Sequence, residues 1–230
     1  MKAERSGAAG PLFLAPLRVE AFAVRRGAHG SSIERMGMGP VRATATRVRL
    51  EAAAERRRPI VLIGFGGALG RELRPGHVVV ASSVVSMPLA DNAAGVSQAP
   101  ALVPRPPDAV PLPVLPDIVA LLRGAGLVVH EGPIVSAPAI VRDDAERKRA
   151  AASGAIAVDM ESYWCAPLAS ARPFAVVRVI VDVPGHDVRS PATLGAGLRA
   201  YRSLVTAARA LGSWSPVSLK DNPLQEVGDL

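Results

Sequence analysis

The sequence predicts a single α/β domain in which a mixed, mostly parallel central sheet is flanked by helices. The length of 230 residues suits one large domain with a buried core. Hydrophobic residues make up 49% of the chain, which is too many for a disordered protein. Short apolar runs alternate with segments of helical composition, as in a parallel sheet between helical layers. We place the domain at residues 11–212 and expect flexible tails at 1–10 and 213–230.

The apolar runs define the predicted strands. Residues 59–63 and 174–181 are continuously apolar apart from Arg178, which is typical of strands covered on both faces. The other strands are expected at residues 12–15, 31–36, 78–85, 127–136 and 155–158. These runs account for the sheet.

The helices are expected between these strands. Their predicted ranges are residues 20–25, 41–57, 117–122, 143–152, 161–171 and 193–211. Residues 89–116 hold many prolines and few periodic positions, so we expect a long loop or lid there.

Charge and composition exclude several classes of protein. The net charge is +7, but no basic stripe is interleaved with aromatic residues, so an arginine-rich solvated surface is favoured over nucleic-acid binding. The one cysteine, Cys165, cannot form an internal disulfide, which fits a reducing compartment. No apolar run is long enough to span a bilayer, and two prolines interrupt the apolar stretch at 10–17. We expect a cytoplasmic protein.

A glycine-rich segment, residues 64–70 (Gly-Phe-Gly-Gly-Ala-Leu-Gly), directly follows a predicted strand. Its third glycine falls one position late for a dinucleotide-binding motif, and the Lys and Ser/Thr of a P-loop are missing. We therefore expect no nucleotide cofactor. Glycines here indicate a loop whose backbone passes close to a ligand or a packed helix.

Two carboxylates follow buried strands. Glu161 comes just after the strand at 155–158, and Asp182 ends the strand at 174–181. Ligands of open parallel sheets bind at the carboxyl ends of strands, so both side chains are expected in one crevice. Spacing alone leaves equal weight to structural roles, Glu161 in the first turn of a helix and Asp182 before a turn.

Residues 157–162 (Ala-Val-Asp-Met-Glu-Ser) and 173–182 (Pro-Phe-Ala-Val-Val-Arg-Val-Ile-Val-Asp) resemble the signature of bacterial methylthioadenosine/S-adenosylhomocysteine nucleosidases, members of the nucleoside phosphorylase superfamily. The resemblance extends over about residues 12–211. It implies cleavage of the N-glycosidic bond of a purine nucleoside, with adenine as the expected base. It also implies no cofactor and a homodimer or larger homo-oligomer.

The resemblance assigns roles to individual residues. Met160 would pack against the ribose, Glu161 would accept hydrogen bonds from its hydroxyls, and Asp182 would be the general acid at purine N7. Glu20 falls where such enzymes keep the carboxylate that positions or activates water. The remaining site residues are the adenine clamp, Ile140 and Val141, and the glycine segment near the anion or water site, Phe65, Gly66 and Gly67.

The chemistry places opposite demands on the two carboxylates. Protonating the departing base typically gives about 10²–10⁴-fold in rate, and needs an acid whose pKa burial has raised. Asp182, at the end of an apolar strand, is expected to be desolvated in this way. Glu161 is expected to stay ionised, because it must accept from two hydroxyls and can stabilise a cationic sugar.

Departures from the family pattern favour water over phosphate as the acceptor. Phe65 stands where the glycine segment usually carries Ser or Thr, and Arg18, Arg42 and Arg178 belong to no phosphate motif. A phosphate-dependent phosphorylase and a non-catalytic nucleoside-binding protein remain alternatives. The proline-rich segment at 89–116 would suit a hopanoid-pathway relative whose nucleoside carries a large apolar 5′ group.

Other reactive residues offer no competing site. The four histidines have no metal-ligand spacing, so no metal is expected. Cys165 fits a small core residue better than a nucleophile. The sequence also lacks the Gly-x-Ser-x-Gly elbow of a serine hydrolase.

Overall fold

The computed structural model describes residues 10–53, 58–87, 109–112, 116–141, 143–182 and 191–216, with side chains from 195 onward in the last range. The strands are β1 (Leu12–Ala15), β2 (Ser32–Arg35), β3 (Ile60–Ala68), β4 (Val78–Ser86), β5 (Ala109–Pro111), β6 (Val129–Ser136), β7 (Ala157–Asp159) and β8 (Phe174–Asp182). The helices are α1 (Arg18–Gly27), α2 (Pro40–Ala52), α3 (Pro116–Gly124), α4 (Asp144–Ala151), α5 (Ser162–Cys165), a 3₁₀ helix (Ala166–Ser170) and α6 (Pro191–Leu211).

The described strands form one mixed sheet that closes on itself. The order is β2-β1-β3-β7-β6-β4-β5, and β8 pairs with both β3 and β4. The strands β3, β7, β6, β4 and β8 therefore form a closed circuit. Five of the eight strand pairs are parallel, which confirms the predicted mixed, mostly parallel sheet.

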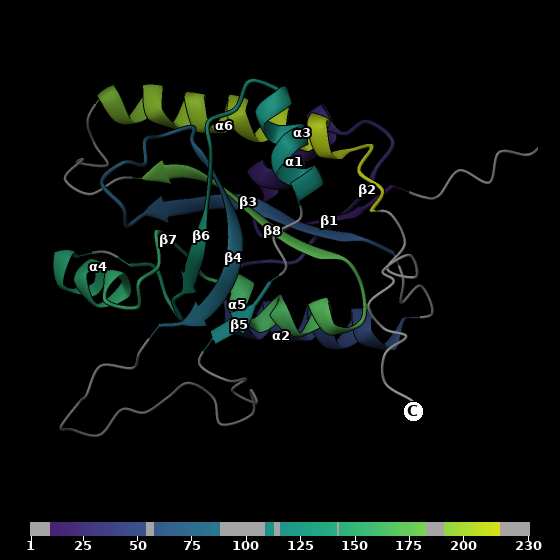
Figure 1. The fold of residues 1–230 in the computed structure, drawn as a ribbon, viewed down its shortest axis with the longest axis horizontal. Coiled ribbons are helices and arrows are strands. Elements are labelled where there is room, and N and C mark those ends of the chain that lie inside the picture. Colours follow the sequence, from purple (N-terminus) through teal and green to yellow (C-terminus); the bar gives the residue numbers. More distant parts are fainter. Residues whose placement is uncertain are drawn as a thin grey trace, which may run out of the picture.

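Helices cover the sheet on both sides (Figure 1). Helices α1, α3 and α6 pack over one face, and α2, α5 and the 3₁₀ helix over the other. The period-two alternation of β3 supplies both cores, with Ile60 and Leu62 on the α2 side and Val61 and Ile63 on the α1–α6 side. Helix α4 lies at the end of β6 and β7, over a third and smaller cluster.

The main error of the sequence-based prediction lies in the glycine-rich segment, which is not a loop. Strand β3 continues through Ala68, and its last residues pair with β8 and β7. Glycines at 64, 66 and 67 lack side chains to pack, so their composition hid a paired strand. The short strand β5 was also not predicted, and residues 89–108 and 113–115 of the expected lid lie outside the described residues.

Two further elements differ from expectation. The helix predicted at 161–171 is broken into α5 and the 3₁₀ helix, since Pro167 has no N–H for a continuous α-helix. Trp214 falls in the segment predicted as a C-terminal tail, but it is buried in the α1–α6 core. Residues 1–9 and 217–230 of the predicted tails lie outside the described residues.

Candidate active site

A cavity of about 250 Å³ opens beyond the carboxyl ends of β1, β3, β6, β7 and β8. Its lining is mostly apolar and includes the carboxylates Glu20, Asp159, Glu161 and Asp182. All nine residues predicted for the site line this one cavity: Glu20, Phe65, Gly66, Gly67, Ile140, Val141, Met160, Glu161 and Asp182. The fold therefore brings together residues from five separate parts of the chain.

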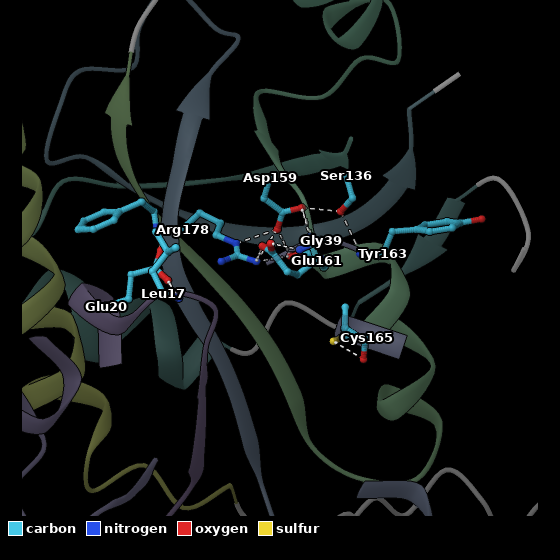
Figure 2. A network of polar contacts seen from close by, with 12 residues as sticks. Leu17, Glu20, Gly39, Ser136, Asp159, Glu161, Tyr163, Cys165 and Arg178 are labelled. Carbon is cyan, nitrogen blue, oxygen red and sulfur yellow. Dashed lines mark hydrogen bonds and ion pairs between the residues drawn. The ribbon is translucent and has the colours of Figure 1, made fainter. Parts of the chain in front are cut away.

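Arg178 is the centre of the polar network beside the cavity (Figure 2). Its position in β8 directs it to the α2 face of the sheet, where it is fully buried. Its Nε lies 2.7 Å from Asp159 Oδ2, and its Nη2 lies 3.3 Å from Glu161 Oε2. Burial acts to lower the pKa of Arg178, but the carboxylates of Asp159, Glu161 and Glu20 outweigh it and raise the pKa.

Asp159 joins Arg178 to the backbone around it. Its carboxylate accepts from the hydroxyls of Ser136 and Ser162, and from the N–H groups of Glu161 and Ser162 at 3.3 Å. Ser136 in turn accepts from the N–H of Tyr163 at 2.9 Å. These bonds fix the turn between β7 and α5, and hence the position of Glu161.

Glu161 lies at the N-terminus of α2. Its Oε1 accepts from the N–H of Gly39 at 3.0 Å, where a helix end favours negative charge. Burial nevertheless raises the pKa of Glu161 from 4.5 to about 7, against the opposing effect of Arg178. The expectation that Glu161 stays ionised therefore needs correction, because its carboxyl group titrates near neutral pH.

Glu20 approaches the cavity from the first turn of α1. Its oxygens accept from the N–H groups of Leu17 and Phe65, each at 2.6 Å, and its side chain is buried. Burial raises the pKa of Glu20. The hydrogen bonds from the two backbone N–H groups and the charge of Arg178 lower it, but their effect is smaller than that of burial. Each oxygen keeps a second lone pair for a further donor.

Gly64 makes this arrangement possible. A Cβ at position 64 would lie 2.6 Å from Glu20 Oε1 and 2.8 Å from Arg178 Nη1. Any side chain would therefore displace both charged groups. The glycines of β3 provide the close backbone approach expected from the sequence, although they do so within a strand.

Asp182 differs from expectation in its burial. It is the last residue of β8 and projects past the covered part of the sheet, so its side chain is 48% exposed. It forms an ion pair with Arg147 of α4, whose Nη1 also donates to Ala68 O at 3.2 Å. The predicted desolvation of Asp182 is wrong.

Apolar side chains complete the cavity wall. Met160 follows β7, and Ile140 and Val141 lie in the segment between β6 and α4. Ile140 is 53% exposed and Met38 is 44% exposed, so both stand at the edge of the cavity. A largely apolar ligand suits such a wall.

Sequence-based prediction did not assign the other eight residues that line the cavity, which are Pro16, Leu17, Met38, Ala139, Arg147, Val158, Asp159 and Val181. Asp159 could have been found, since the charge of Arg178 within an apolar strand requires a buried partner. Arg147 carried no signal, because it belongs to a polar helix with many charged neighbours.

Other candidate groups lie away from this cavity. His77 and His130 stack with ring centroids 5.1 Å apart, and the described residues include no group of three or more His, Cys, Asp or Glu side chains arranged to hold a metal ion. Cys165 is fully buried in the α2-side core, as predicted, and burial raises the pKa of its thiol. None of the helices in the described ranges is long and apolar enough to cross a membrane.

The mixed sheet, with helices on both faces and a carboxylate-lined cavity at its strand ends, defines a class of α/β protein with a nucleoside phosphorylase-like fold. Residues 2–212 match the family described as the phosphorylase superfamily, and the chain belongs to that superfamily. The membership predicted from the sequence is confirmed.

Solved structures show the same fold. Futalosine hydrolase of Helicobacter pylori strain 26695 is 20% identical, with 90% of this chain and 97% of that chain covered and a TM-score of 0.68. The methylthioadenosine/S-adenosylhomocysteine nucleosidase of Campylobacter jejuni is 15% identical, with coverages of 88% and 98% and a TM-score of 0.69. The corresponding Neisseria meningitidis enzyme, bound to methylthio-immucillin-A, is 18% identical, with coverages of 89% and 97% and a TM-score of 0.64. No curated protein matches the chain in sequence.

Proposed function

We propose that this protein is a nucleosidase that hydrolyses the N-glycosidic bond of a purine nucleoside, with adenine as the base. The observation that carries this proposal is the shared cavity of Glu20, Glu161 and Asp182. Nucleosidases among the solved structures with this fold support the same reaction class. Glu20 and Glu161 are buried, whereas Asp182 is half-exposed beside Arg147, so the acid role of Asp182 requires that the bound substrate cover its carboxyl group.

In this proposal Glu161 binds the ribose hydroxyls and Met160 packs against the sugar. Ionised Glu161 also stabilises positive charge on the ribose as the bond breaks. The Gly39 N–H and Arg178 hold its carboxylate in place before substrate arrives. This preorganisation limits the reorganisation needed during the reaction.

Asp182 donates a proton to N7 of the departing purine. The base, clamped by Ile140 and Val141, covers the exposed carboxylate and takes the place of Arg147 as its partner. Arg147 is thus a positioning residue, which holds Asp182 at the cavity in the free protein. Glu20 orients the attacking water through the lone pairs that its backbone bonds leave unused.

The surroundings of the cavity favour water over phosphate. Arg18 and Arg42 are exposed and do not line the cavity, and the guanidinium of Arg178 is bound by carboxylates. Arg147 is the one arginine among the described lining residues, and Asp182 occupies it. Phosphorolysis remains the second candidate, since Arg147 could turn to an anion. A requirement for phosphate during turnover would decide for it.

The first test is incubation with adenosine, inosine and methylthioadenosine, with and without phosphate, with free base followed by chromatography. We expect base release without phosphate. Asp182→Asn and Glu161→Gln should each lower kcat/KM by about 10²–10⁴-fold. The matched exposed substitutions Asp117→Asn and Glu131→Gln should leave the rate unchanged.

Circular dichroism of each variant separates loss of chemistry from loss of fold. Near-normal turnover in Asp182→Asn would refute the proton-donor role. Tight nucleoside binding by the wild-type protein with no base release would instead identify a non-catalytic binding protein. A nucleoside with a bulky apolar 5′ group tests the hopanoid-type substrate: slower cleavage than methylthioadenosine would exclude it.

A further inference from the structure

We propose that the outer face formed by α1 and α6 docks onto an anionic lipid bilayer. The two helices pack side by side over the same face of the sheet, on the outside of the molecule (Figure 1). The inference stands on charge and exposed apolar area, and it does not depend on the proposed reaction.

The charges of this face have one sign. Each helix carries three exposed arginines, and the set is Arg18, Arg25, Arg26, Arg199, Arg202 and Arg209. Helix α6 contains no acidic residue, and Glu20, the one acidic residue of α1, is buried in the site. Lipid headgroups of negative charge attract such a surface, whereas a neutral partner leaves its charge uncompensated.

Exposed apolar side chains lie among these arginines. Phe22 is 59% exposed, Val19 is 48% exposed and Leu198 is 51% exposed. The spacing of Val19, Phe22 and Arg26 places them in one stripe along α1. Basic residues mixed with exposed apolar side chains are typical of helices that lie in a membrane interface.

An open hollow of about 500 Å³ lies between the two helices, lined by Arg26, Leu198, Tyr201, Arg202, Val205 and Thr206. Its two guanidinium groups come from different helices and can bind one phosphate group together. Leu198 and Val205 provide apolar surface beside them. This combination matches a phospholipid, in which a charged phosphate adjoins an apolar chain.

A second copy of this chain is a poorer occupant. A two-fold dimer places the same patch of each subunit against itself, so the arginines would face arginines. Like charges brought together in this way oppose association. A bilayer of anionic lipid has no such conflict and accepts Phe22 and Val19 between its headgroups.

Docking would also place the cavity near the lipid. Leu17, which lines the cavity, directly precedes Arg18, the first residue of α1. The membrane-facing stripe therefore begins next to the cavity wall.

The test is co-sedimentation of the full chain with vesicles of phosphatidylcholine alone or with roughly one third phosphatidylglycerol. We expect binding to the anionic vesicles, with loss at about 1 M salt, where the Debye length is about 3 Å. Arg26→Glu/Arg202→Glu should weaken binding by more than about tenfold. Phe22→Ser should weaken it several-fold at low salt as well.

Two control variants match the test variants, one in the change of net charge and the other in the loss of an exposed apolar side chain. Arg71→Glu/Arg149→Glu makes the same change of charge at exposed sites elsewhere, and Val48→Ser removes an exposed apolar side chain from α2. Neither should affect binding. Equal weakening by the control pair, or no binding to anionic vesicles, would overturn the proposal. A change between monomer and dimer in the α1–α6 variants, measured by light scattering, would also overturn it, because the face would then be an interface between two copies. So would binding to heparin as tight as binding to the anionic vesicles and unaffected by Phe22→Ser, because charge alone would then explain the binding.

Discussion

Three buried carboxylates, those of Glu20, Asp159 and Glu161, surround the guanidinium of Arg178, which is the positive charge that compensates them. A buried charge is tolerated only when it is paired and hydrogen-bonded, and Asp159 and Glu161 supply that pairing. With Glu20 near the same group, full ionisation would leave excess negative charge in the core. Burial is the main cause of the raised pKa values of Glu20 and Glu161, and repulsion from the carboxylate of Asp159 adds to it.

Replacing Arg178 should be strongly destabilising. Arg178→Met leaves the buried carboxylate of Asp159 without its cation, so we expect a loss of about 3–5 kcal/mol in the free energy of unfolding. Denaturant titration at neutral pH measures this loss. Arg149→Met, at an exposed site, should change it by less than about 0.5 kcal/mol. A loss below about 1 kcal/mol in Arg178→Met would show that the pair contributes little.

The pKa of Glu161 predicts a pH dependence of activity. Only ionised Glu161 can accept from both ribose hydroxyls, and its pKa in the free protein is about 7. We therefore expect kcat/KM to rise as pH increases through about 7, because this parameter reports the free enzyme. Glu161→Gln should lose this limb of the profile. A wild-type profile that is flat between pH 5 and pH 8 would contradict the assignment.

Among the elements, β3 has a glycine-rich second half that its composition predicts as a loop, and these glycines allow side chains of the site to pack against its backbone. Its first half is an apolar strand buried on both faces, and its second half is a paired strand with almost no side chains. Gly66 and Gly67 let Arg178 and Val158 pack against its backbone, with a Cβ at either position within 3.2 Å of these groups. This close approach depends on the whole strand, because the pairing of β3 with β8 fixes which residue of β8 lies beside each glycine.

Two glycine-to-alanine substitutions should have opposite effects. Gly64→Ala forces a methyl group against Glu20 and Arg178, and we expect a loss of about 1–3 kcal/mol in stability together with most of the activity. Gly195→Ala, in α6 with nothing within 4 Å, should stabilise the protein by about 0.5–1 kcal/mol. Thermal unfolding measures the stability of both variants, and base release measures their activity. If Gly64→Ala changed neither stability nor base release, the carboxylate of Glu20 would not lie against Gly64.

At the scale of the whole molecule, Glu161 should make folding stability depend on pH. Its pKa is about 7 when folded, against an ordinary value of 4.5, so between these pH values the folded state binds more protons than the unfolded state. Stability from this group is therefore full below pH 4.5 and declines as pH rises to about 7. The decline is about 2–3 kcal/mol.

The measurement is the free energy of unfolding of the wild-type protein and Glu161→Gln at a series of pH values. The difference between the two curves isolates Glu161 from other carboxyl groups. It should change in favour of the variant as pH rises from 4.5 to 7. A difference that is constant over this range would show that the pKa of Glu161 is not raised.

Much of the fold was predictable from the sequence, because strands buried on both faces leave continuous apolar runs such as residues 60–63. The paired strand at Gly64–Ala68 and the break at Pro167 were not predicted, since local composition favoured a loop and a helix there. The rule for parallel strands placed Glu161 and Asp182 in one cavity, and they do line one cavity. The reason differs, however, because β3 pairs in parallel with β8 but antiparallel with β7, so β7 and β8 are not parallel to each other.

The sequence by itself determined the layered α/β fold, the superfamily and nine of the residues around the cavity. Tertiary structure alone decided the raised pKa of Glu161, the exposure of Asp182 and its pairing with Arg147. The physical reason is that periodicity and motifs record local order along the chain. Burial and Coulomb interactions depend instead on distances between segments far apart in sequence, such as the first turn of α1, the end of β8 and the middle of α4.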